Sequence, residues 1–312
     1  MNSLRCAVVS REEGFVPLGS AGDYRGFLLV DWPLPWPSKL EQAPGIEPIV
    51  AALKGTGIRL QGVVPATGTD TRRVALYVRP AGDGFAGYRR VVRRTDPFPE
   101  PDDVVAVALG LLGRADALAA AEAAPPDQAE AMTGDLLVCT HGRRDACCGS
   151  LGTALALELL ADTDVAKAGY QVGRTSHTGG HRFAPTAIVL PEGSMWAFLD
   201  ADLASRVVRR DGPVEAVLDA YRGSTAVGSP AVQALEQVAF GDVGWGWLDW
   251  SRSGTDDGAG RVTVTARSPE GEARTWAAEA TARTVPVPDC GKPLAEARKT
   301  STEPVLGPVT RT

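Results

Sequence analysis

The 312-residue sequence contains very little histidine and cysteine, with three histidines and five cysteines in the whole chain. Five cysteines do not make a disulfide framework in a chain of this size. In a reducing compartment, clustered cysteines more often bind metal or take part in catalysis. The positions of these scarce residues are therefore more informative than their number.

The chain also lacks the features of export, membrane insertion and nucleic-acid binding. Residues 1–15 contain no apolar core of a secretory signal. The longest apolar run, residues 104–113, is far shorter than the roughly 20 residues that span a bilayer. The net charge is −6, and no run of lysine or arginine stands out. We therefore expect a cytoplasmic protein with neither a nucleic acid nor a membrane as partner.

What remains is typical of a globular protein of about two domains, with 44% hydrophobic and 22% charged residues. Two parts of the chain show the same predicted order of strand, loop, helix, three strands and helix. In the first, we expect strands at residues 24–30, 58–64, 73–79 and 88–93, with helices at 38–54 and 104–112. In the second, we expect strands at residues 135–139, 170–175, 186–190 and 195–199, with helices at 149–160 and 201–210. Residues 115–132 are expected to form a helical extension or a linker.

This order is that of the thioredoxin-like fold. We predict an α/β protein with two tandem thioredoxin-like units, at residues 1–125 and 133–212. The first has DWPLPWP where the second has CTHGRRDACC, so we expect metal ligands only in the second. The alternative is that two α/β segments share this order by chance.

A smaller C-terminal α+β region is expected at residues 213–299, followed by a flexible tail at 300–312. Its helices are predicted at 214–221 and 230–239, and its strands at VGWGWLDW, GRVTVTARS and ARTWAAEA. We expect its tryptophans, Trp245, Trp247 and Trp250, to pack in the core of a small sheet.

All three histidines and three of the five cysteines fall within 43 residues. They are His141, His177, His181, Cys139, Cys147 and Cys148. Scattered residues without a common role would be spread over unrelated segments. The clustering therefore indicates a metal site.

The local context of these residues favours soft or borderline metals. Cys139 ends a predicted buried strand, and Cys148 begins a predicted helix, whose dipole lowers the pKa of a thiol at its first turn. Between His177 and His181, glycines predict a loop that can approach a bulky inorganic group closely. Thiolate with imidazole suits zinc, iron or copper, and the lack of clustered carboxylates excludes magnesium. The same lack of clustered carboxylates means that the sequence shows no pair of carboxylates typical of a glycosidase active site.

The segment CTHGRRDACCG, followed by SHTGGHRFAP and a short hairpin, resembles the sucrase/ferredoxin-like family. The opening PLGSAGDYRGFLLVDWPLPW is also similar to actinobacterial members, so the resemblance covers nearly the whole chain. The family implies a thioredoxin-like ferredoxin whose [2Fe–2S] cluster is held by the cysteines of C-x8-C and the histidines of H-x3-H. On this sequence, these positions are Cys139, Cys148, His177 and His181.

Other residues near these four are expected to shape the cluster environment, although solvated loop positions would explain them equally well. They are His141, Arg143, Arg144, Asp145, Cys147, Arg174, Gly179, Gly180 and Arg182. Cys147 also competes with Cys148 as the ligand, because a shift of one residue would exchange them. Cys6 and Cys290 are expected to be ordinary thiols.

We therefore expect an electron-transfer or redox-sensing protein rather than an enzyme with a substrate of its own. No nucleotide- or flavin-binding loop is evident, so the electron donor would be a separate protein. One alternative is a thiol-disulfide oxidoreductase without a cluster, which leaves both histidines unexplained. Another is a zinc-stabilised binding module, in which the four residues enclose a structural ion.

Overall fold

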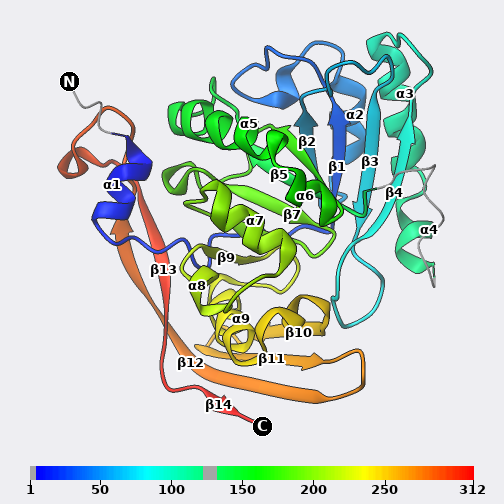
Figure 1. The fold of residues 1–312 in the computed structure, drawn as a ribbon. Coiled ribbons are helices and arrows are strands. Elements are labelled where there is room, and N and C mark those ends of the chain that lie inside the picture. The colour runs from blue at the N-terminus through cyan, green and yellow to red at the C-terminus, as the bar shows by residue number, and fades with distance from the viewer. Residues whose placement is uncertain (1–4, 122–131) are drawn as a thin grey trace.

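The computed structural model describes residues 5–121 and 132–312 and shows a mixed α/β protein with two sheets (Figure 1). The larger sheet has nine strands in the order β4-β3-β1-β2-β6-β5-β7-β8-β9. Their bounds are β1 Gly26–Asp31, β2 Ile58–Val63, β3 Arg73–Val78, β4 Arg89–Arg94, β5 Gly134–Cys139, β6 Tyr170–Thr175, β7 Ala187–Leu190, β8 Ser194–Trp196 and β9 Tyr221–Ser224.

The two halves of this sheet repeat one pairing pattern. In the first half, β1 runs parallel to β2 and antiparallel to β3, which pairs antiparallel with β4. In the second half, β5 runs parallel to β6 and antiparallel to β7, which pairs antiparallel with β8. The halves meet where β2 and β6 pair at Val63 and Thr175. The α/β class is confirmed, and the classification as two thioredoxin-like units stays a prediction.

Helices cover the outer face of each half. The first half carries α2 Glu47–Leu53, α3 Pro101–Leu112 and α4 Ala115–Ala120, and the second carries α5 Thr153–Ala161, α6 Thr163–Lys167 and α7 Ala201–Arg209. Alternate residues of a strand point to opposite faces. Leu28 of β1 packs under the first set of helices, and Leu136 of β5 under the second. The inner faces, including Leu29 and Leu137, share one further hydrophobic cluster, so the halves pack against each other.

A buried ion pair joins the halves within this shared core. Arg73 of β3 donates from both terminal nitrogens to the two carboxylate oxygens of Asp135 on β5, each at 3.0 Å. The hydroxyl of Tyr77 donates to the same carboxylate at 2.5 Å. Both charged side chains are almost fully buried. Breaking a buried ion pair by removing one charge is strongly destabilising.

The C-terminal region contains a second, antiparallel sheet. Helices α8 Glu215–Leu218 and α9 Pro230–Val243 are followed by β10 Ser251–Asp256, β11 Arg261–Arg267, β12 Ala273–Pro286, β13 Thr300–Leu306 and β14 Thr310–Arg311. The first part of β12 pairs with β11 and the second part with β13. Together, β12 and β13 form a long hairpin that reaches α1, Cys6–Glu12 (Figure 1).

Several sequence expectations are corrected here. Residues 300–312 form β13 and β14 rather than a flexible tail, because their backbone groups pair with β12. VGWGWLDW is not a strand, since Gly244–Asp249 forms a 3₁₀ helix, although Trp247 and Trp250 are buried in the core as expected. The helix expected at 38–54 is interrupted near Pro44, leaving a 3₁₀ turn at Leu40–Gln42 and then α2.

Two further expectations concern the chain around these elements. The helix expected at 214–221 ends at Leu218, and β9 follows it. Of the helical extension or linker expected at 115–132, residues 115–120 form α4. Residues 122–131 lie outside the described part of the chain. Among the described residues, no helix has both the length and the apolar character that crossing a membrane requires.

Candidate metal centre

Cys139 and Cys148 occupy two adjoining ends of secondary structure in the second half. Cys139 is the last residue of β5, and Cys148 begins a π-helical turn, Cys148–Gly152, that leads into α5. Such turns are frequent at functional sites. A Cβ atom at Gly152 would lie 2.0 Å from the Cys139 carbonyl oxygen, so only glycine lets the helix start this close to the strand.

The two thiols are fully buried and influence each other's pKa in opposite directions. Contact with the Cys148 thiol lowers the pKa of Cys139, and His177 adds to this effect, although burial opposes it. The same contact and burial raise the pKa of Cys148. Because a metal ligates thiolates, metal binding here would release protons from the thiols.

Asp145 orders the segment between the cysteines. One of its carboxylate oxygens accepts hydrogen bonds from the backbone N–H groups of Cys147 at 2.9 Å and Cys148 at 3.2 Å. The other lies 2.9 Å from Nδ1 of His181. Burial opposes ionisation, but His181 and the two N–H groups lower the pKa of Asp145 overall. A carboxylate paired with a histidine fixes the tautomer and orientation of that ring.

The two histidines lie on the loop between β6 and β7. The donor atoms of His177, Cys139 and Cys148 all lie within 4.8 Å of one another. Nδ1 of His177 is buried and has no hydrogen-bond partner among the described residues. The His181 ring centroid lies 6.5 Å from that of His177. The structure therefore places three of the four predicted ligands together and the fourth beside them.

Arg222 of β9 holds this loop in place. Its guanidinium donates to the Gly179 carbonyl oxygen at 3.2 Å and to the Ser20 carbonyl oxygen at 2.6 Å. Gly180 is required here for two reasons: a Cβ atom would lie 2.6 Å from the guanidinium, and its φ of +67° is one that other residues rarely adopt. Burial lowers the pKa of Arg222 to about 10, and Cys139 and Cys148 oppose this shift. The sequence pattern around Arg222 gives no signal of this role.

His141 connects the site to the first half of the sheet. Its Nε2 lies 2.7 Å from the Pro37 carbonyl oxygen, and its Nδ1 accepts the backbone N–H of His177 at 3.3 Å. Burial lowers the pKa of His141. It therefore acts on the position of His177 and has its nitrogens occupied by other groups.

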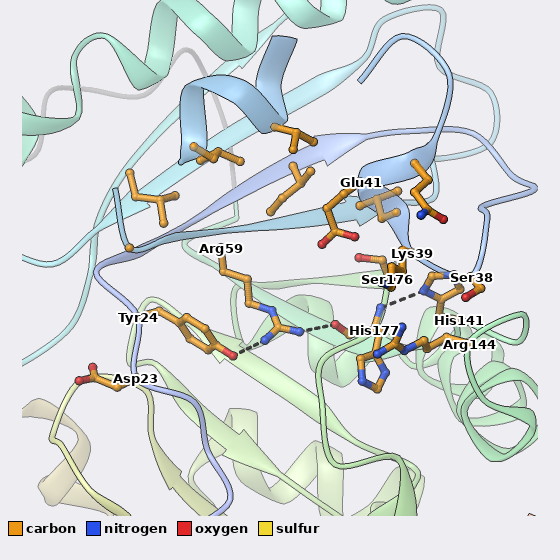
Figure 2. A pocket seen from close by; sticks show the side chains of 17 residues that line it. Asp23, Tyr24, Ser38, Lys39, Glu41, Arg59, His141, Arg144, Ser176 and His177 are labelled. Atoms are coloured by element: carbon orange, nitrogen blue, oxygen red, sulfur yellow. Dashed lines mark hydrogen bonds between the residues drawn. The ribbon is translucent and has the colours of Figure 1, made fainter. Parts of the chain in front are cut away.

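A cavity of about 810 Å³ opens between the two halves, as Figure 2 shows. His141, Arg144, Ser176 and His177 line it from the second half. From the first half, Arg59 reaches across and donates to the His177 carbonyl oxygen. The histidine side of the site therefore faces a route by which solvent and small molecules can approach.

The remaining predicted neighbours are placed at different depths. Arg143 is exposed, Arg174 is half-buried on β6, and Arg182 is buried with its guanidinium 4.5 Å above the Phe183 ring. Cys147 is fully buried, but its donor atom belongs to a second group with Cys6, Cys290 and Asp145. Sequence reasoning missed that group, because Cys6 and Cys290 lie far from Cys147 along the chain.

Comparison with known proteins places the chain in a family. The sucrase/ferredoxin-like family model matches residues 17–223, which is well over half of the sequence. The chain therefore belongs to the sucrase/ferredoxin-like family. The matched region contains both cysteines of C-x8-C and both histidines, and it leaves Cys6 and Cys290 outside. No match was found among the curated proteins or among the solved structures.

Proposed function

We propose that Cys139, Cys148, His177 and His181 hold a [2Fe–2S] cluster and that the protein transfers single electrons or senses redox state through it. The observation that carries the proposal is the convergence of two buried cysteines and His177 on one point, with His181 beside them. Family membership adds weight, because these residues lie within the matched region.

The donor set fits such a cluster. Thiolate and imidazole are the ligands of Rieske-type [2Fe–2S] centres, in which two histidines serve one iron and two cysteines the other. The buried Nδ1 of His177 has no partner among the described residues and could serve as a ligand. Asp145 orients the His181 ring as carboxylates orient metal-binding histidines elsewhere. When bound, the cluster would accept and return one electron.

The residues around the site would hold and tune it. Arg222 fixes the histidine loop, and its positive charge favours the more negative, reduced state. The hydrogen bond from the backbone N–H of His177 to Nδ1 of His141 positions His177. The cavity between the halves gives solvent and a redox partner access to the histidine side. The donor and acceptor would be separate proteins.

A single zinc ion is a second candidate for the same four residues. In a tetrahedral site, zinc would bring all four donor atoms to about 3.8 Å or less from one another. His181 lies outside the group of Cys139, Cys148 and His177, whose donor atoms are within 4.8 Å. A cluster with two iron ions accommodates the greater distance of His181 from the other three ligands better than a single ion does. A dithiol enzyme is disfavoured because Cys139 and Cys148 are both fully buried.

Purification under anaerobic conditions, followed by iron, sulfide and zinc analysis, tests the proposal. We expect a red-brown protein with equal amounts of iron and acid-labile sulfide, lost in Cys139→Ser and Cys148→Ser. Cys147→Ser should keep the colour, because Cys147 belongs to the other group. A colourless protein with zinc at Cys139 and Cys148 would overturn the proposal.

A further inference from the structure

Three cysteines that the proposed cluster does not use meet at one point. Cys6 begins α1, Cys147 precedes the π-helical turn, and Cys290 lies in the loop between β12 and β13. Their sulfur atoms form a near-equilateral triangle, with Cys6 to Cys147 at 3.5 Å and Cys290 at 3.3 Å from each of the others. A carboxylate oxygen of Asp145 completes the group, in which all donor atoms lie within 4.8 Å of one another.

This geometry suits a soft metal ion better than a disulfide. A disulfide would hold two sulfurs at about 2.05 Å and leave the third thiol over. Zinc binds thiolates at about 2.3 Å, which spaces sulfurs in a tetrahedron about 3.8 Å apart. The observed separations are a few tenths of an ångström shorter and similar for all three pairs. Metal binding would therefore move the three sulfurs apart by only that amount.

The group also connects three segments that lie far apart in the sequence. The loop between β12 and β13 runs beside α1 (Figure 1). Among the described residues, the backbone hydrogen bonds of residues 288–298 stay within that loop. The Cys290 sulfur reaches outside it, to the Cys6 N–H at 3.4 Å and to the sulfurs of Cys6 and Cys147 at 3.3 Å. The hydrophobic cluster here is small: apart from cysteines it contains Ala7 and Ala184, with Leu151 packed against it. A bound ion would cross-link both segments to the Cys147 turn.

Adjacent residues in the sequence serve the two groups separately. Cys148 faces Cys139 and His177, whereas Cys147 faces Cys6 and Cys290. We propose that Cys6, Cys147 and Cys290, with the Asp145 carboxylate as fourth donor, form a second metal site that binds one thiophilic d¹⁰ ion such as zinc. The two sites adjoin: Asp145 contacts both, and the Cys6 sulfur lies 3.5 Å from Nδ1 of His181.

Zinc binding to the full chain tests this site. The Cys139→Ser/Cys148→Ser double variant removes the thiols of the proposed cluster, so its zinc content reports on the second site alone. We expect this variant to retain one zinc ion per chain. Adding Cys6→Ser or Cys290→Ser should weaken zinc binding by more than about tenfold, since even the loss of residues that only support ligands costs 10–100-fold. Circular dichroism checks that each variant is folded.

X-ray absorption at the zinc edge gives a second readout that needs no variant. In the wild-type protein, we expect a first shell dominated by three sulfurs. Two sulfurs with two nitrogens would place the zinc at Cys139, Cys148 and the histidines and overturn the second site. Zinc binding that is unchanged in Cys6→Ser and Cys290→Ser would also overturn it. So would a disulfide among the three cysteines, detected by mass in the anaerobically purified chain, or failure of the wild type to bind zinc.

Discussion

The guanidinium of Arg222 donates to the Gly179 carbonyl oxygen, so a strand outside the cysteine and histidine segments fixes the loop that carries both predicted histidine ligands. The side chain is 1% exposed, and its other hydrogen bonds go to Ser20. No carboxylate accepts these bonds. A buried cation is thus held by backbone and hydroxyl oxygens beside two buried thiols, where it can balance negative charge.

Replacing Arg222 should therefore loosen the histidine loop and change the reduction potential of the cluster. In Arg222→Met, two backbone carbonyl oxygens lose their donor, which costs about 1–3 kcal/mol for each group left unsatisfied. Loss of the positive charge should also lower the reduction potential of the cluster. Protein-film voltammetry and the rate at which visible absorption is lost on heating measure both effects.

The matched control for this substitution is Arg206→Met. Arg206 is a partly exposed arginine on α7, paired with Asp202 one helical turn away. Its replacement should change neither the potential nor the rate of cluster loss. Equal behaviour of the Arg222 and Arg206 variants would contradict the role given to Arg222.

The buried ion pair between Arg73 and Asp135 should contribute strongly to the stability of the protein, because it joins the two halves. Asp135→Asn keeps the shape of the side chain but removes the negative charge that pairs with the buried guanidinium of Arg73. We expect the free energy of unfolding to fall by about 3–5 kcal/mol. Urea unfolding followed by tryptophan fluorescence measures the change.

Asp116→Asn is the control for that experiment. Asp116 pairs with Arg25, but its side chain is 92% exposed. Exposed pairs contribute about 0–1 kcal/mol. If the Asp135 and Asp116 variants lose the same stability, the buried pair does not join the halves in the way described.

The histidine ligation predicts a pH-dependent reduction potential. Reduction adds negative charge to the cluster and so raises the pKa of imidazole N–H groups on its ligands. The oxidised protein therefore loses these protons first as the pH rises, and the potential should fall by up to about 59 mV per pH unit for one proton and one electron. Voltammetry between neutral pH and mildly alkaline pH checks this slope. A potential that stays constant over that range would contradict ligation by neutral histidines.

Local sequence patterns were enough to predict most of the large sheet and the grouping of Cys139, Cys148 and His177. Cys139 and Cys148 lie at the end of one element and the start of the next, so their proximity follows from a strand–loop–helix pattern. The strands of both halves were predicted to within a few residues, apart from β9. The continuous hydrophobic runs of β1 and β5 gave a clear signal, because both faces of these strands are buried.

The features that were missed depend on contacts between distant segments. Strand β9 has only four residues, and its sequence, YRGS, has no hydrophobic alternation. Cys6 and Cys290 are separated by 284 residues, and only the docking of the β12–β13 hairpin against α1 brings them to Cys147. The tail was misjudged for the same reason, since β13 and β14 gain their order from pairing with β12.

Electron paramagnetic resonance of the dithionite-reduced protein tests the central claim most directly, with the wild type compared with His177→Cys and His181→Cys. Each substitution replaces a neutral imidazole with an anionic thiolate. We predict a [2Fe–2S] signal in the wild type, whose g-values shift in both variants, and a lower reduction potential in each. A wild-type protein without an iron–sulfur signal, or spectra and potentials unchanged in both variants, would contradict a cluster held by Cys139, Cys148, His177 and His181.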